Sequence, residues 1–173
     1  MIIAGTGNKS GKTSMACRIL EQLRYFEIVS VKITPHFHET TPGLVLLSEK
    51  KGYSVYEETN IDTFKDTSRM LKAGASRVYF AKVTDNSLVE AFKEIMEYIP
   101  EGTPIICESP ALRHYTEPGL FVIMTSPLKD NQKNIKSLMN LPHVEFNMDY
   151  LSRNKVIPIS LSNGKWISLQ NGF

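Results

Sequence analysis

A glycine-rich segment near the start of the chain restricts its fold more than any other feature. Residues 5–14 read Gly-Thr-Gly-Asn-Lys-Ser-Gly-Lys-Thr-Ser, between an apolar run at residues 1–4 and a helical pattern at residues 13–24. A Gly-Lys-Thr core between a strand and the helix that it opens is typical of a Walker A loop, which holds the phosphates of a nucleoside triphosphate. The spacing departs by one residue, because five residues instead of four separate Gly5 from Gly11.

The residue types of this segment suit phosphate binding. Glycines let backbone N–H groups converge on phosphate oxygens, and the start of the helix adds a partial positive charge. We expect Lys12 to reach the β- and γ-phosphates and the Thr13 hydroxyl to ligate Mg²⁺. The predicted nucleotide-binding residues are Gly7, Asn8, Lys9, Ser10, Gly11, Lys12, Thr13 and Ser14. A glycine-rich turn that only starts a helix is the alternative.

Apolar patterns along the rest of the chain alternate between strands and helices. Further strands are predicted at residues 28–33, 77–83, 104–107 and 120–124, and helices at 63–73 and 87–98. Two β-hairpins are predicted, one at residues 44–56 as an excursion from the main sheet and one at 156–169. This order favours a three-layer α/β domain of the P-loop NTPase fold, with a mostly parallel sheet and inserted β-hairpins. The 173 residues suit a single domain.

Two acidic residues are candidates for the chemistry beside the loop. Glu108 ends an apolar strand where a Walker B acid would lie, so it could hold Mg²⁺ through water or orient an attacking water as a catalytic residue. Asp66 could approach the same metal, although a capping box with Thr63 explains this residue without a ligand. The predicted metal ligands are therefore Thr13, Glu108 and Asp66, with a solvated strand-end carboxylate as the alternative for Glu108.

Other reactive side chains give weaker indications. His36 and His38 alternate in an extended segment and could bind a metal together, but two exposed loop histidines are the simpler reading. Cys107 directly precedes Glu108, so the two side chains should point to opposite faces of the sheet. Lys129-Asp130 does not have the spacing of the guanine-binding Asn-Lys-x-Asp signature, and a solvated charged loop explains it better.

Charge and hydropathy exclude two classes of partner. The net charge is only +2 and the 20 basic residues are scattered along the chain, so we expect no nucleic-acid binding. No apolar stretch approaches the roughly 18 residues that a membrane span needs, and no signal peptide is recognisable. We therefore expect a cytoplasmic protein that does not interact with membranes.

Three segments together resemble the MobB family of molybdopterin-guanine dinucleotide biosynthesis adaptors. They are the glycine-rich segment, Val31-Lys32-Ile33-Thr34-Pro35-His36-Phe37-His38, and the Lys65-Asp66-Thr67 run that ends at Ala73-Gly74-Ala75. Ile105-Ile106-Cys107-Glu108 is similar to the family's apolar strand ending in glutamate. The resemblance implies a Mg²⁺-dependent, GTP-binding homodimer with slow hydrolysis at most, which assists a molybdenum cofactor nucleotidyltransferase or a molybdoenzyme maturation protein.

Departures from the family pattern affect the predicted role. Phe64 stands where the family tends to have glycine, and Ser109-Pro110 replaces Gly-Phe after the glutamate. The leading hypothesis is an accessory protein that binds GTP or ATP with Mg²⁺. One alternative is a small kinase or ligase, although Arg69, Arg77 and Arg113 are dispersed in the sequence. Another is a degenerate scaffold that acts through protein contacts.

Overall fold

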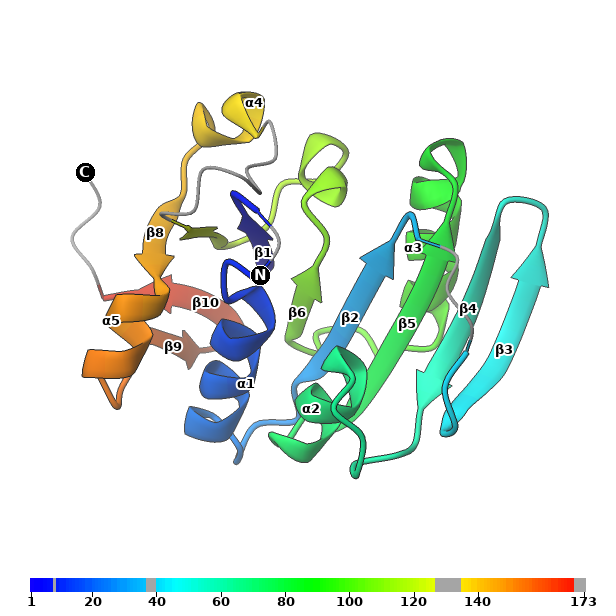
Figure 1. Cartoon of the computed structure of the whole chain (residues 1–173), viewed down its shortest axis with the longest axis horizontal. Helices are drawn as coiled ribbons and strands as arrows, with labels where there is room; N and C mark the ends of the chain where they lie inside the picture. Colours follow the sequence, from blue (N-terminus) through cyan, green and yellow to red (C-terminus); the bar gives the residue numbers. More distant parts are fainter. Residues whose placement is uncertain (8, 37–39, 127–134, 170–173) are drawn as a thin grey trace.

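The core of the fold is a mostly parallel sheet of eight strands, as the computed structural model gives it (Figure 1). The structure describes residues 1–7, 9–36, 40–126 and 135–169. Across the sheet the order is β3-β4-β5-β2-β6-β1-β7-β8. In chain order these strands are β1 (Ile2–Gly5), β2 (Val29–Thr34), β3 (Leu44–Lys50), β4 (Tyr53–Glu58), β5 (Arg77–Val83), β6 (Ile105–Glu108), β7 (Phe121–Thr125) and β8 (Val144–Asn147).

The central strands are parallel, and their order across the sheet differs from their order along the chain. β6 pairs with both β1 and β2, so the first two strands of the chain are separated by one strand instead of being neighbours. Strands buried on both faces read as continuous apolar runs, which explains why the sequence reveals β1, β6 and β7 clearly. The predicted α/β class with a mostly parallel sheet is confirmed.

The hairpin β3–β4 corrects one expectation. It was predicted as an excursion, but β4 pairs antiparallel with β5 from Tyr53↔Val83 to Glu57↔Tyr79. The hairpin therefore extends the main sheet and makes β3 its edge strand. Local alternation identifies a hairpin, whereas its place beside β5 depends on pairing between segments that are distant in sequence.

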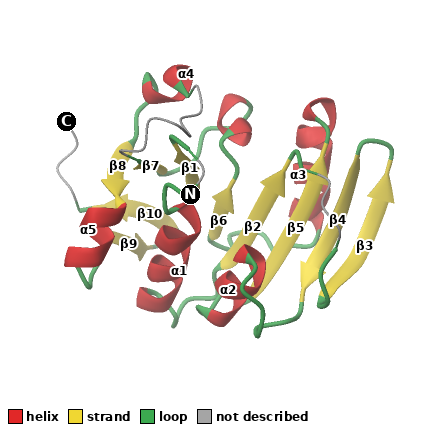
Figure 2. Cartoon of the chain, viewed as in Figure 1, coloured by secondary structure: helices red, strands yellow, loops and turns green. Residues whose placement is uncertain are grey.

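Helices cover both faces of this sheet (Figure 2). On one face lie α1 (Lys12–Gln22), α2 (Asp66–Lys72), α5 (Met148–Arg153) and a small antiparallel sheet of β9 (Ile159–Ser162) and β10 (Lys165–Ser168). On the other lie α3 (Leu88–Glu97), α4 (Lys136–Met139) and the short 3₁₀ helix η2 (Ala111–His114), with η1 (Asp85–Ser87) leading into α3. None of the described helices has the length and apolar character needed to cross a bilayer.

Helix ends show how local signals and tertiary contacts compete. Gly74, at φ +109°, follows α2 as the predicted stop. The predicted capping box of Thr63 and Asp66 is wrong, because α2 has Lys65 at its N-cap without a side-chain cap, and Asp66 turns instead to Lys32 of β2. By contrast, the Asn147 side chain caps α5 by accepting a hydrogen bond from the Tyr150 N–H at 2.8 Å.

Candidate functional site

The glycine-rich loop, residues 5–14, lies at the carboxyl end of β1 and leads into α1. Its first turn is tied to the sheet, because the Thr6 N–H donates to the Met124 carbonyl at 3.0 Å and the Thr6 hydroxyl accepts from the Ser126 N–H at 2.8 Å. Lys9 has φ 59° and Gly11 φ 95°, so the loop takes the left-handed conformation twice. This repeated reversal of the chain keeps the loop tightly curled above β1.

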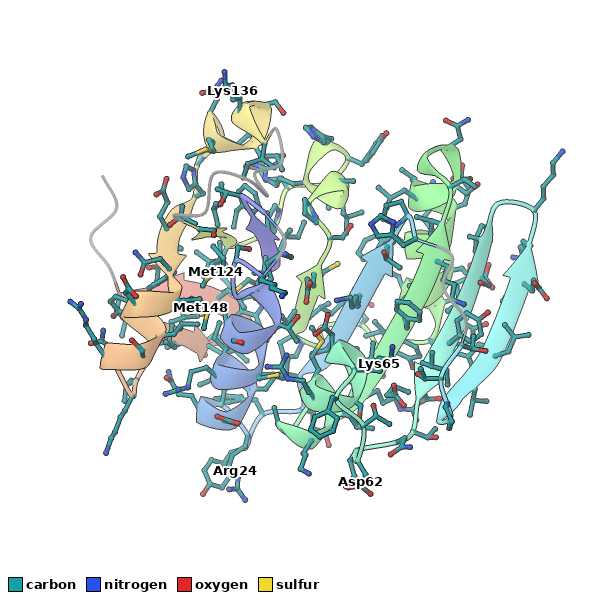
Figure 3. All side chains as sticks on the ribbon, in the orientation of Figure 1. Arg24, Asp62, Lys65, Met124, Lys136 and Met148 are labelled. Atoms are coloured by element: carbon teal, nitrogen blue, oxygen red, sulfur yellow. The ribbon has the colours of Figure 1, made fainter. Side chains whose placement is uncertain are left out.

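Two glycines of this loop lie where an added Cβ would collide with neighbouring side chains. A Cβ on Gly5 would lie 2.1 Å from the Ser10 hydroxyl oxygen, and one on Gly11 would lie 2.3 Å from the Met148 sulfur. Figure 3 shows Met148 beside Met124 at the start of α1. The Ser10 hydroxyl is buried over Gly5, with no hydrogen-bond partner among the described residues.

A cavity of about 480 Å³ opens in front of the loop. The predicted site residues that line it are Lys9, Gly11, Lys12, Thr13, Ser14, Asp66 and Glu108. Gly7 and Ser10 are not among its lining residues, and the predicted Asn8 lies outside the described residues. The Lys12 ammonium donates to the Gly7 carbonyl at 3.3 Å, which holds its side chain across the loop. The residues predicted from three separate segments therefore meet at one cavity.

Thr13 and Glu108 are in direct contact. The Thr13 hydroxyl donates to Glu108 Oε2 at 2.8 Å, and both residues are buried. Glu108 is the last residue of β6, which pairs with β1, so its side chain reaches the first turn of α1 from the neighbouring strand. Cys107 points to the opposite face, as expected from the alternation of a strand.

Lys32 of β2 connects the two candidate acids. Its ammonium donates to Asp66 and, at 3.2 Å, to Glu108 Oε1. Burial alone would lower the pKa of Lys32, but attraction to Glu108 and Asp66 outweighs it and the pKa is raised. Burial would raise the pKa of Asp66, yet the charge and hydrogen bond of Lys32 lower it. Lys32 therefore stays a cation at neutral pH, held between two carboxylates.

Sequence reasoning assigned no role to Lys32 and set Arg69 aside as too dispersed, yet both line the cavity. Arg69 contacts Asp66 at 3.5 Å and donates to the Ser14 hydroxyl at 3.4 Å. The available signal for Lys32 was a charged residue inside the apolar run Val31-Lys32-Ile33, because an unpaired lysine is almost never buried. Of the residues that the structure describes, four cationic side chains, Lys9, Lys12, Lys32 and Arg69, line the cavity together with the two carboxylates.

Thr13 and Glu108 fit Mg²⁺ only in company with a ligand that brings further oxygens. Neighbouring oxygens around an octahedral Mg²⁺ lie about 3.0 Å apart, given Mg–O distances of about 2.1 Å. The Thr13 and Glu108 oxygens are already 2.8 Å apart. However, no cluster of three or more His, Cys, Asp or Glu residues in the described part of the chain could hold a metal by itself. Phosphate oxygens and water would have to complete the coordination.

The remaining candidate side chains add little chemistry. His36 lines the cavity, whereas His38 lies outside the described residues, as do Lys129 and Asp130. Burial raises the pKa of the half-buried Cys17 thiol to about 11, so it stays protonated at neutral pH and is a poor nucleophile.

Comparison with known proteins returns no relative: no family model, curated protein or solved structure matches this chain. The predicted membership of the MobB family stays a prediction.

Proposed function

We propose that this chain is a P-loop protein that binds a magnesium nucleoside triphosphate in the cavity at the glycine-rich loop. The observation that carries this proposal is the contact between Thr13 and Glu108 beside Lys12 at the head of α1. A hydroxyl and a carboxylate side by side, next to a lysine and the N–H groups of a curled loop, are the groups that a Mg²⁺–triphosphate requires. The bound Mg²⁺ would neutralise charge on the phosphates.

The electrostatics of the cavity support an anionic ligand. Among the described residues, four cations and two carboxylates line it, and Lys32 contacts both acids. Lys9, Lys12 and Arg69, which also contacts Asp66, lie nearer the loop, where phosphate groups would lie. A cavity with an excess of positive charge concentrates polyphosphates by electrostatic attraction.

Two finer features of the proposal depend on the family resemblance alone. These are a preference for GTP over ATP and service as a homodimeric accessory protein to a molybdenum cofactor nucleotidyltransferase. Nothing in the described cavity distinguishes guanine from adenine. Hydrolysis, if present, would use Glu108 to orient the attacking water and would be slow, because Glu108 is already engaged by Thr13 and Lys32.

Isothermal titration with GTP and ATP, with and without Mg²⁺, tests the proposal. We expect Lys12→Ala to weaken binding tenfold or more, because a charged hydrogen bond contributes about 1.5–3 kcal/mol. The matched control is Lys93→Ala, which removes an exposed lysine of α3 on the opposite face of the sheet. Binding that is equal in both variants would exclude Lys12 from the site. Absence of any nucleotide binding would favour the degenerate scaffold.

A second candidate function, phosphoryl transfer to a small molecule, is favoured by Lys32 and Arg69 in the cavity wall. In that reaction an acceptor oxygen bonds to the γ-phosphorus while the bond to the β-phosphate oxygen breaks and the nucleoside diphosphate leaves. Cations beside the γ-phosphate stabilise the charge that develops. Label from γ-labelled nucleotide that appears on an organic acceptor, and not only as inorganic phosphate, would support transfer.

A further inference from the structure

A second, smaller cavity adjoins the first on the side away from the glycine-rich loop. It has a volume of about 130 Å³ and shares Lys32 and Asp66 with the larger cavity. Its other lining residues are Thr41, Leu44, Lys65, Thr67, Phe80 and Lys82. The Lys32–Asp66 pair therefore forms a wall between two cavities rather than the end of one.

The sheet register explains why the two cavities meet at this pair. Along one face, Glu108 of β6 lies opposite Lys32 of β2, and Lys32 lies opposite Phe80 of β5. Neighbouring strands are about 4.8 Å apart, so Phe80 is one strand away from Lys32 and two from Glu108. Thr34 and Lys82 form the next row toward the carboxyl end of β2. The second cavity thus lies over β5, beside the row that begins at Glu108.

Its lining combines positive charge with an apolar surface. Among the described residues, three lysines and one carboxylate, Asp66, line it, and Asp66 also contacts Lys32. Lys82 is only 6 % exposed although it lies in a strand, and its ammonium is 5.2 Å from the centre of the Tyr56 ring. Lys65 directly precedes α2 (Figure 3).

Phe80 and Leu44, both half-buried, supply the apolar part of the lining. The buried carboxylate of Glu58 is not among the lining residues; it accepts hydrogen bonds from the Thr67 hydroxyl at 2.7 Å and the Asn60 N–H at 3.0 Å. An apolar surface with a few convergent charged groups is the composition of a small-molecule site.

We propose that this second cavity binds a small organic anion, a carboxylate or phosphate monoester with one compact apolar group. The anionic head would lie against Lys82 and Lys65, and the apolar group against Phe80 and Leu44. The proposal that an anion binds here rests on this lining alone. That the bound anion would lie beside a nucleotide, on the other side of Lys32 and Asp66, rests on the proposed function.

The test uses the full chain and two probes, benzoate for a carboxylate head and phenyl phosphate for a phosphate head, in isothermal titrations. We expect at least one probe to bind, and Lys82→Met to weaken that binding about tenfold, because methionine keeps the apolar stem and loses the charge. Lys72→Met, at an exposed lysine of α2 outside both cavities, should bind as the unmodified chain does. Leu44→Trp, which fills the cavity without changing its charge, should also weaken binding.

The outcomes separate this site from the proposed nucleotide site. Probe binding that is lost in Lys82→Met but kept in Lys12→Ala supports the second site, even where no nucleotide binds. Binding lost in Lys12→Ala and kept in Lys82→Met assigns the anion to the glycine-rich loop and overturns the second site. Failure of both probes to bind, or equal affinity in Lys82→Met and Lys72→Met, overturns it as well.

Discussion

Two buried carboxylates on opposite faces of the sheet have the same kinds of partner. Glu108 accepts from the Thr13 hydroxyl and from Lys32, while Glu94 of α3 accepts from the Tyr53 hydroxyl and from Lys50. Each glutamate is buried, with a hydroxyl and a lysine in contact. Because the two clusters are so similar in composition, the difference between their surroundings shows what makes one of them a candidate site.

The surroundings of the two glutamates differ in their access to a cavity and in the presence of a second carboxylate. Glu94 holds the turn of the β3–β4 hairpin against α3 and lines neither cavity. Glu108 faces the larger cavity, and its lysine also binds a second carboxylate, Asp66. A buried carboxylate with a hydroxyl and a lysine is therefore compatible with a purely structural role. The glycine-rich loop and the cavity, not the pairing itself, single out Glu108.

The largest difference is expected when each lysine is removed. Lys32→Met should lower the free energy of unfolding by about 3 kcal/mol, because Glu108 is left buried without its cationic partner. Lys50→Met should cost less, since the Lys50 side chain is 60 % exposed and Glu94 keeps the Tyr53 hydroxyl. Urea denaturation of both variants measures the difference, and equal losses would mean that the two clusters are energetically alike.

The next largest effect is expected at the Glu94 cluster, whose contribution to the free energy of unfolding should be lost at acidic pH. Burial opposes ionisation of Glu94, but hydrogen bonds from Lys50, Ser48 and Tyr53 outweigh it and lower its pKa from 4.5 to about 2. Since the folded-state pKa lies below the unfolded one, the stabilisation is present above about pH 4.5 and is lost as the pH falls toward about 2. Glu94→Gln should therefore be less stable at neutral pH and decline less steeply across this window. Parallel declines in unfolding free energy for both chains would contradict the assignment.

The contrast between these clusters also explains how far sequence reasoning could reach. The glycine-rich loop is contiguous, so local spacing alone predicts Lys12 and Thr13 as site residues, and both line the larger cavity. The strand at residues 77–83 and the helix before Pro100 have strong periodicity and lie where they were predicted. The segments β8 and α5 were missed, because runs of four and six residues carry too little periodicity to be recognised.

What the sequence could not supply are contacts between distant segments. The sequence allowed Asp66 to be either a capping-box residue or a site residue. Its contact with Lys32, 34 residues away, places Asp66 in the wall of the cavity. Arg69 was discounted because arginines are scattered in the sequence, yet the packing of α2 beside α1 brings it to Ser14. Such juxtapositions depend on strand order and helix packing, which a local pattern does not encode.

The smallest expected difference is the most specific for function. Under the proposed function, Glu108→Gln should reduce the gain in nucleotide affinity that Mg²⁺ provides by about tenfold, or about 1.4 kcal/mol, because a neutral amide is a poorer magnesium ligand than a carboxylate. Affinity without Mg²⁺ should not fall, since the phosphates lose a nearby negative charge. Glu94→Gln is the matched control and should leave both affinities unchanged, because Glu94 lies on the opposite face and lines neither cavity. Titrations in magnesium and in a chelator measure all four values. An identical magnesium dependence in the two variants would leave Glu108, like Glu94, as a carboxylate that only stabilises the fold.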